Sequence, residues 1–250
     1  MAKRSLAATL IWPGLFTAVG LALLIALGVW QLHRLAWKEG LIAEVSARVG
    51  APPVGLPPES AWPSLKPADY EYRHVRAAGF YDFAHQALIF RALGNPRGRY
   101  GGPGYLVLTP LKLSDGAIVI VNRGFIPEDK KAAFSGGADQ GPPAAEIIGL
   151  MRSPESRTWF TPADDPAAGQ WFTRDPFAIA AAMKLDRVAP FTIDADAGPD
   201  PAALPEGGET ILSFPNNHLS YAFTWFGMAL ALIGVFGTFA WKKREEFARD

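Results

Sequence analysis

The sequence predicts an α+β membrane protein in which two transmembrane helices flank a mostly antiparallel, β-rich domain outside the cytoplasm. Three observations lead to this fold class. Two long runs without a charged residue lie near the ends of the chain, at residues 5–32 and 219–241. Between them, short runs of β-branched and aromatic residues alternate with turn residues, which is typical of strands and hairpins. The chain has 250 residues, enough for one such domain between two anchors.

The first apolar run has the length of a membrane-spanning helix, because a bilayer core needs about 20 helical residues. We assign residues 10–32 to this helix and residues 1–9 to a cytoplasmic N-terminus. The alternative is a signal peptide with Lys3 and Arg4 as its basic start. That alternative is disfavoured because the run exceeds the usual length of about 7–15 residues and no small-x-small cleavage site follows. The run ends instead in VWQLHRLAWK, an aromatic and basic interfacial collar.

The second apolar run is bracketed by aromatic residues and followed by a basic cluster. Tyr221 and Trp225 lie near its start, Trp241 lies at its end, and the basic residues 242–244 come next. Basic clusters stay on the cytoplasmic side, so two spans place both termini there. The predicted segments are a β-rich outer domain at 33–217, a second transmembrane helix at 218–241 and a cytoplasmic basic tail at 242–250.

The outer domain is predicted to consist mainly of strands. A short amphipathic piece at residues 37–49 precedes a proline-rich connector at 51–67, for which we expect neither regular helix nor strand. The turn triplet at residues 114–116 predicts a hairpin. One helix is expected after Asp175, with this residue as N-cap and Pro176 at the first helical position. The predicted strands lie at 74–82, 87–93, 104–113, 117–125, 144–153 and 189–196.

The composition and the motifs exclude several classes of protein. Lys plus Arg and Asp plus Glu each number 24, so no basic excess is available to neutralise nucleic-acid phosphates. The absence of cysteine excludes disulfides, thiolate zinc sites, iron–sulfur clusters and covalent c-type haem attachment. No nucleophile elbow, phosphate loop or HExxH motif occurs, so we expect no enzyme.

The remaining charged candidates are interpreted as structural. Asp164 with Asp165, and Asp194 with Asp196, occur in turn-like contexts, where solvated carboxylates are more common than catalytic ones. Arg123 closes an apolar strand directly before a glycine. For this arginine we favour a structural contact, such as a salt bridge, over a docking contact.

Two of the four histidines, His33 and His218, lie at the predicted outer membrane boundary. Imidazole is a common axial ligand of haem iron, and the two rings would lie at similar depth if the helices pack together. Tyr221 and Trp225 follow His218 on one helical face and could hold a planar macrocycle. The alternative is that residues 216–218 only cap the helix while the aromatic residues anchor it. On the residues alone, this alternative is favoured.

Four stretches of the chain, taken in the order in which they occur, resemble a known family. They are WQLHRLAWKEGLIAEV, GFYD, GYLVLTPLKLSDGAIVIVNRGFIP and NNHLSYAFTWFGMA. Together they resemble the Surfeit locus protein 1 family, which consists of membrane-anchored assembly factors for cytochrome c oxidase. Each stretch alone has low specificity, whereas four in order, joined to two predicted spans, form a strong resemblance over most of the chain.

The resemblance implies a non-enzymatic role in the maturation of a haem-copper oxidase, by binding haem a and assisting its delivery to the catalytic subunit. The histidine of the family at the second helix corresponds to His218, which becomes the implied ligand of the haem iron. Arg34 and Lys38 are the nearest basic residues in sequence for the haem propionates. A second ligand at His33 is our own hypothesis, since the family pattern leaves this position open.

The resemblance also implies partners and a location. The expected partners are the catalytic subunit of the oxidase, the machinery that makes haem a, and membrane lipid. Because the N-terminus lacks an Arg- and Ser-rich transit segment, we expect the bacterial cytoplasmic (inner) membrane, with the domain in the periplasm. Two alternatives stay open: a cofactor-free scaffold that stabilises an oxidase subunit, and a membrane enzyme acting on a lipid or a haem precursor.

Overall fold

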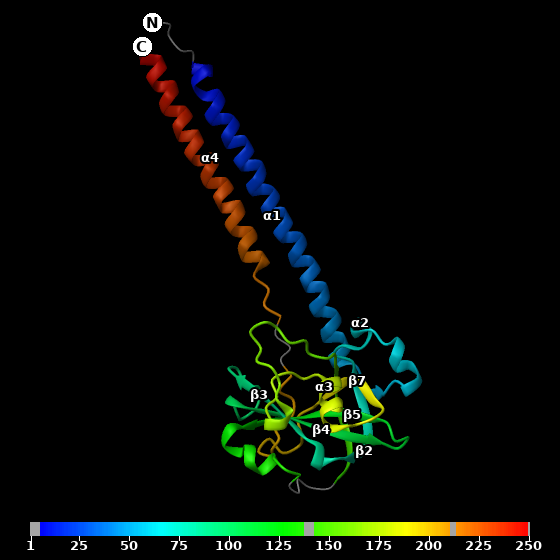
Figure 1. Ribbon diagram of the computed structural model, residues 1–250. Coiled ribbons are helices and arrows are strands. Elements are labelled where there is room, and N and C mark those ends of the chain that lie inside the picture. Colours follow the sequence, from blue (N-terminus) through cyan, green and yellow to red (C-terminus); the bar gives the residue numbers. More distant parts are fainter. Residues whose placement is uncertain (1–5, 138–142, 211–213, 250) are drawn as a thin grey trace. The chain divides into compact units, whose positions relative to one another are not determined.

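The computed structural model describes residues 6–137, 143–210 and 214–249. The chain divides into two compact units, which can be followed by colour in Figure 1. One unit combines residues 1–44 with 213–250, and the other contains residues 45–212.

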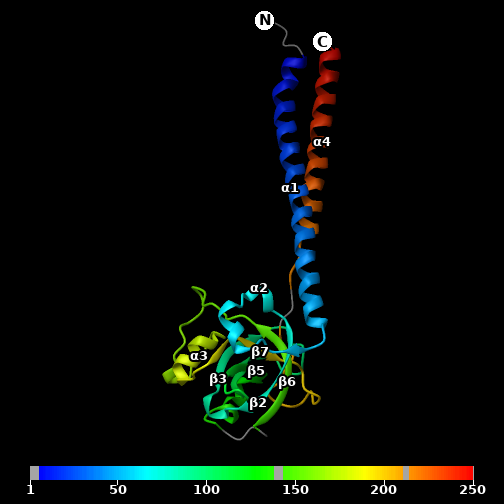
Figure 2. The same cartoon turned by 90° about the vertical axis from the view of Figure 1, so that its right-hand side faces the viewer.

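The first unit consists of two long helices, α1 (Leu6–Gly50) and α4 (His218–Arg249), which run side by side in Figures 1 and 2. Both are long and apolar enough to cross a membrane, as the sequence predicted. Helix α1 does not end with the apolar run but continues through the collar and the amphipathic piece. The reason is local: no proline occurs between His33 and Gly50, and good helix formers dominate this stretch. The last turns of α1 belong to the second unit.

The second unit is built on a sheet that, in the described residues, has seven strands in the order β1-β2-β6-β7-β5-β4-β3. An additional pairing of β2 with β4 closes five of these strands into a small barrel. The strands are β1 (Val54–Gly55), β2 (His74–Tyr81), β3 (Ala87–Leu93), β4 (Gly102–Leu113), β5 (Ile118–Pro127), β6 (Ala144–Arg152) and β7 (Val188–Ala195).

Most neighbouring strands are antiparallel, as predicted, but β1 pairs with β2 and β5 with β7 in parallel. The six predicted strands are all present, with ends that differ by a few residues. The predicted hairpin joins β4 to β5: Gly116 has a φ of +84°, and Oδ1 of Asp115 accepts a bond from the Ala117 amide at 3.0 Å. Parallel pairing of β5 with β7 follows from the long connection between them.

Short helices complete the unit. The predicted helix is α3 (Pro176–Met183), and Asp175 caps it by accepting a hydrogen bond from the Phe177 amide at 2.9 Å. The other short helices are α2 (Pro67–Tyr70) and the 3-10 segments η1 (Glu59–Ser64), η2 (Phe83–His85), η3 (Glu128–Phe134) and η4 (Pro166–Ala168).

The proline-rich connector was predicted to lack regular structure, and this is wrong because it contains β1 and η1. A buried tryptophan explains why this segment is ordered. Trp62 is buried, its Nε1 donates to the carbonyl of Pro57 at 3.0 Å, and its ring meets Phe191 edge-on with centroids 6.0 Å apart. Burial of this large side chain in the barrel core fixes a segment that has little intrinsic preference for structure.

The core has two main parts. Inside the barrel, side chains such as Leu111, Val121 and Phe191 form the larger cluster. On the other face, Ile120 and Trp171 pack with α3. Because β4 and β5 have apolar side chains on both faces, their sequences are nearly continuous apolar runs instead of alternating ones.

Candidate functional site

His218 is the first residue of α4, and its side chain is bonded to the other long helix. The ring atom Nδ1 lies 2.7 Å from Oε1 of Gln31 on α1. An amide oxygen only accepts hydrogen bonds, so Nδ1 carries a proton, and in the neutral ring Nε2 then has the free lone pair. Gln31 therefore fixes the orientation and the tautomer that a metal-binding histidine needs.

A glycine permits the close approach of α1 and α4 at this point. A Cβ atom on Gly28 would lie 2.5 Å from Cε1 of Phe226, closer than real Cβ atoms come to other heavy atoms. The Phe226 ring thus fills the space that a side chain would need. Gln31 lies one turn further along the same face of α1, and both it and Gly28 are buried. The glycine contact therefore brings Gln31 within reach of His218.

The aromatic stripe predicted after His218 lies beside the contact between the helices. Ala222 and Ala229 are buried in the helix pair, whereas Tyr221 is exposed and Trp225 is half-buried. The indole Nε1 of Trp225 is nevertheless buried, without a hydrogen-bond partner among the described residues. This indole with an unused donor lies about two turns beyond His218 on the same face of α4, and the face between them is an edge on which a flat ring could pack.

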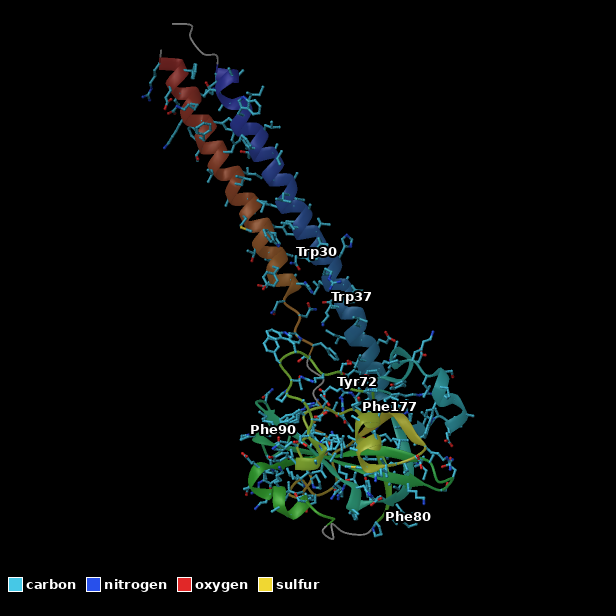
Figure 3. The ribbon with its side chains drawn as sticks, in the orientation of Figure 1. Trp30, Trp37, Tyr72, Phe80, Phe90 and Phe177 are labelled. Atoms are coloured by element: carbon cyan, nitrogen blue, oxygen red, sulfur yellow. The ribbon has the colours of Figure 1, made fainter. Side chains whose placement is uncertain are left out.

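The two basic residues assigned to the propionates lie on the same side of α1 as Gln31, one and two turns further along. The guanidinium carbon of Arg34 is 4.2 Å from the ring centroid of Trp37, which is labelled in Figure 3. The Nζ atom of Lys38 is 5.8 Å from the ring centroid of Phe214. Both cations thus extend the polar edge that begins at Gln31, each against an aromatic face.

His33 lies apart from this arrangement. It follows Gln31 by two positions, which is about 200° around the helix, and it is exposed. The imidazole of His218 meets an amide instead of a second imidazole. The hypothesis that His33 and His218 flank one ring therefore finds no support in this helix pair.

The donor set at α4 suits a haem iron better than a bare metal ion. Across the described ranges, no group of three or more His, Cys, Asp or Glu side chains could hold a metal ion. A haem iron takes its four equatorial ligands from the porphyrin, so one imidazole with a free nitrogen is enough to bind it. His218 meets this requirement, and the neighbouring aromatic and basic residues match a ring that bears carboxylates.

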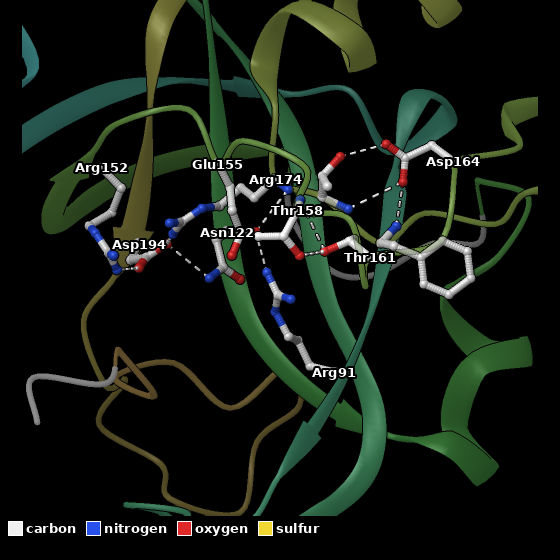
Figure 4. Close-up of polar contacts among 11 residues, drawn as sticks. Arg91, Asn122, Arg152, Glu155, Thr158, Thr161, Asp164, Arg174 and Asp194 are labelled. Carbon is white, nitrogen blue, oxygen red and sulfur yellow. Dashed lines mark hydrogen bonds and ion pairs between the residues drawn. The ribbon is translucent and has the colours of Figure 1, made fainter.

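The barrel unit carries a second polar cluster, centred on Asp194 of β7 (Figure 4). This residue is 4% exposed, and its carboxylate accepts hydrogen bonds of 2.7–2.9 Å. The donors are the side chains of Asn122, Arg152, Arg174 and Thr210. Burial raises the pKa of Asp194, but the ion pairs outweigh burial and leave this pKa below its ordinary value. The prediction of a solvated turn residue is wrong here, because β7 carries Asp194 into the interior.

A cavity of about 220 Å³ lies beside this cluster. Arg91 and Arg174 line it, and Nε of Arg174 is buried without a hydrogen-bond partner in the described part of the chain. Both arginines already pair with carboxylates, Arg91 with Glu155 and Arg174 with Asp194. We therefore interpret the cluster as a structural ion network of the barrel, in which the buried charges are paired with one another.

The adjacent polar residues in the middle of β5 belong to different contacts. Asn122 donates to Asp194, whereas the guanidinium carbon of Arg123 lies 5.1 Å and 5.0 Å from the ring centroids of Tyr81 and Phe83. The structural role expected for Arg123 is confirmed, and aromatic rings make the contact.

The carboxylates of Asp164 and Asp165 both accept backbone hydrogen bonds, and Asp165 is exposed, as predicted for a solvated carboxylate. Asp164 accepts from the amides of Phe172 and Thr173, and Asp165 accepts from the amide of Ala168 at 3.1 Å. They fix the loop and its 3-10 turn, so a solvated role is wrong for Asp164, which is half-buried.

Gln31 is the residue of the candidate site to which the sequence analysis gave no role. The signal was present: an amide closes an apolar helix, three positions after a glycine and so on the same face. Its partner could not be identified, because nothing local connects residue 31 to residue 218.

Comparison with known proteins gives one consistent result. The SURF1 family model matches residues 18–230, from within α1 to within α4. Surfeit locus protein 1 of Xenopus tropicalis is 32% identical over 230 residues, covering 88% of this chain and 71% of the relative. The Rattus norvegicus protein of the same name is 34% identical over 215 residues, with coverages of 82% and 68%. The Homo sapiens protein is 33% identical over 216 residues, with coverages of 82% and 70%.

Proposed function

This chain belongs to the SURF1 family, and on that premise we propose that it is a non-enzymatic assembly factor for cytochrome c oxidase. Its proposed activity is to bind haem a and to assist the delivery of haem a to the catalytic subunit. His218 is the proposed ligand of the haem iron. The observation that carries this assignment is the 2.7 Å bond from His218 Nδ1 to Gln31 Oε1.

The residues at this site have separable roles. Gln31 orients the imidazole and keeps the lone pair on Nε2 of His218. When bound, haem a supplies an iron that accepts this lone pair. The residues proposed to contact the propionates and the ring are Arg34, Lys38, Tyr221 and Trp225. Contacts between the basic groups and carboxylates are charge-assisted and would orient the ring.

The proposal includes both long helices spanning a bacterial cytoplasmic membrane, with the barrel unit in the periplasm. Each helix contains a stretch of sufficient apolar length, and the basic residues 242–244 follow the apolar part of α4. Basic residues favour the cytoplasmic side, which supports cytoplasmic termini. Membrane lipid, the oxidase catalytic subunit and the haem a synthesis machinery are the proposed partners.

The visible absorption spectrum of the purified full chain, produced together with haem a synthesis, tests the proposal. We expect a haem a band in the wild type and its loss in His218→Ala. His33→Ala is the matched control, because His33 is exposed and lies about 200° around α1 from Gln31, so the band should remain.

Two results would contradict haem binding at this site: a wild-type chain without haem under these conditions, or an unchanged band in His218→Ala. A haem-free chain that still captures the oxidase catalytic subunit would favour the cofactor-free scaffold.

A further inference from the structure

Two aromatic side chains extend almost fully into solvent on the loop that follows β6. Trp159 is 85% exposed and Phe160 is 76% exposed, and their ring centroids are 3.7 Å apart. Each is a large apolar side chain with no core to cover it in the barrel unit. Adjacent exposed aromatic residues of this size indicate a binding surface.

The tip of this loop is held in one conformation. Thr158 and Thr161 bracket the aromatic pair, and their side-chain oxygens are 2.8 Å apart (Figure 4). The Thr161 amide donates to the Thr158 carbonyl at 3.1 Å, and Nε of Arg157 donates to the Thr161 carbonyl at 3.0 Å. A tip that is already ordered loses little conformational freedom when it binds.

The two ends of the loop are also fixed to the barrel unit. Glu155, at the start, pairs with Arg91 and accepts a hydrogen bond from the Arg174 amide at 3.1 Å. Asp164, at the end, accepts a hydrogen bond from the Thr173 amide at 3.2 Å. The loop that carries the aromatic pair is therefore bonded to the rest of the barrel unit at both ends, through Glu155 and Asp164, which are labelled in Figure 4.

Within the barrel unit, the loop begins where the chain arrives from α1. Arg48, in the last turn of α1, donates to the carbonyl oxygens of Ala68 at 2.8 Å and Glu71 at 3.2 Å. The carboxylate of Glu71 accepts a hydrogen bond of 2.5 Å from the amide of Ser153, the first residue after β6. Glu71 thus contacts both the end of α1 and the base of the aromatic loop.

The chain also leaves the barrel unit toward α4 at this end. The hydroxyl of Thr210 donates to Asp194 at 2.9 Å, and Asp194 pairs with Arg152, the last residue of β6, at 2.8 Å. Both connections to the apolar helices and the base of the aromatic loop therefore share one end of the barrel.

We propose that Trp159 and Phe160 insert into the lipid interface of the membrane, as an anchor of the barrel unit in addition to the two helices. This inference rests on the proposed membrane insertion of α1 and α4. Those helices tie this end of the barrel covalently to the bilayer. A tryptophan, a phenylalanine and the neighbouring Arg157 match the aromatic and basic groups that prefer the level of lipid headgroups.

The absence of cysteine from the chain allows a direct test at single labelled positions. The first variant is Ala163→Cys, at an exposed position that follows the aromatic pair in the loop. The full chain is labelled with bimane at this cysteine and inserted into nanodiscs of phosphatidylcholine and phosphatidylglycerol with brominated acyl chains. We expect the brominated chains to quench the label and the bilayer to shield it from aqueous iodide. Adding Trp159→Ser and Phe160→Ser should abolish both effects without loss of fold, because both rings are exposed.

Phe80→Ser provides the matched control for removal of an exposed aromatic side chain. Phe80 pairs with Ala144 at the start of β6, whereas the loop follows Arg152 at the end of that strand. Quenching of the Ala163→Cys label should be unchanged in this variant. A second labelled protein, Leu230→Cys on the exposed side of α4, reports membrane insertion itself.

The two labels separate the possible failures. If the label at 230 is quenched while the label at 163 stays open to iodide, the lipid anchor is overturned and membrane insertion stands. The aromatic pair would then belong to a protein contact. If neither label is quenched, both the anchor and the proposed membrane insertion are overturned.

Discussion

At the scale of single residues, the chemistry of His218 depends on an amide 187 positions away in the chain. Because the Gln31 oxygen only accepts hydrogen bonds, it selects the imidazole tautomer with an unprotonated Nε2. The same histidine with Nδ1 unpaired could rotate and exchange tautomers. In the proposed site Gln31 is therefore a positioning residue, and its contribution can be separated from that of the proposed ligand, His218.

Replacement of Gln31 tests this role. Gln31→Leu keeps the approximate size but loses the acceptor, and we expect about 10- to 100-fold weaker haem a binding, the usual effect of losing such a partner. Gln31→Glu keeps an acceptor for Nδ1 and should bind nearly as well as the wild type. The measurement is a spectroscopic titration of the purified chain with haem a. Equal affinities for the Leu variant and the wild type would remove Gln31 from the site.

Asp194 differs from Gln31 because we expect its buried polar contacts to stabilise the barrel and not to position a ligand. Asp194→Asn removes the charge that Arg152 and Arg174 share, and leaves two largely buried guanidinium groups without it. Loss of one partner from a buried ion pair costs about 3–5 kcal/mol. Urea unfolding of the full chain in detergent, followed by tryptophan fluorescence at pH 7, measures this loss. Identical midpoints would show that the network contributes nothing.

The same residue predicts an acid dependence. The pKa of Asp194 is lower in the folded chain than its ordinary value of about 3.9. Its contribution to stability is therefore present above that pH and is lost as the pH falls through the folded-state pKa. Unfolding midpoints of the wild type should decline on acidification below about pH 4, and those of Asp194→Asn should decline less steeply. Parallel declines would assign acid sensitivity to other carboxylates.

At the scale of elements, the geometry of the helix pair depends on residue size at one position. Gly28 admits the ring of Phe226, and the closeness of the two backbones lets the longer Gln31 side chain reach across. Glycine inside a helix is otherwise destabilising, by about 1 kcal/mol relative to alanine. Its presence here is explained by the contact that it permits.

Substitution at this glycine should disturb the site from a distance. Gly28→Ala forces α1 and α4 apart or displaces the Phe226 ring, so we expect reduced haem a retention. Gly40→Ala is the matched control on the same helix, because a Cβ atom there meets nothing within 4 Å. The double variant Gly28→Ala with Phe226→Ala should recover part of the haem. The haem absorbance per protein is measured for Gly28→Ala, Gly40→Ala and the double variant. A normal band in Gly28→Ala would show that the contact between Gly28 and Phe226 is not needed for haem retention.

At the scale of the whole molecule, the proposed topology rests on charge and apolar length. Labelling of single cysteines in intact bacterial spheroplasts with a membrane-impermeant maleimide tests it. Ser114→Cys, exposed in the β4–β5 hairpin, should react from outside, and Ala248→Cys should react only after lysis. The chain has no other cysteine to interfere. Reaction of both positions before lysis, or of neither, would contradict the proposed topology.

Much of the architecture was predictable because its signals are local. Apolar length identified α1 and α4, β-branched and aromatic runs identified six strands, and Asp175 with Pro176 marked α3. Errors occurred where a distant contact overrides local preference. Trp62 orders a proline-rich segment by entering the barrel core, and Asp194 becomes a buried ion in spite of its turn-like sequence.

The sequence by itself determined the two apolar helices, the strand-rich domain between them and the family resemblance, which in turn pointed to His218. These depend on composition, periodicity and motif order, which are properties of neighbouring residues. Only the tertiary structure decided that the sheet closes through β2 and β4, that Gln31 and not His33 meets His218, and that Asp194 gathers two arginines. These features join residues far apart in the chain, and such pairing depends on packing geometry that local pattern does not encode.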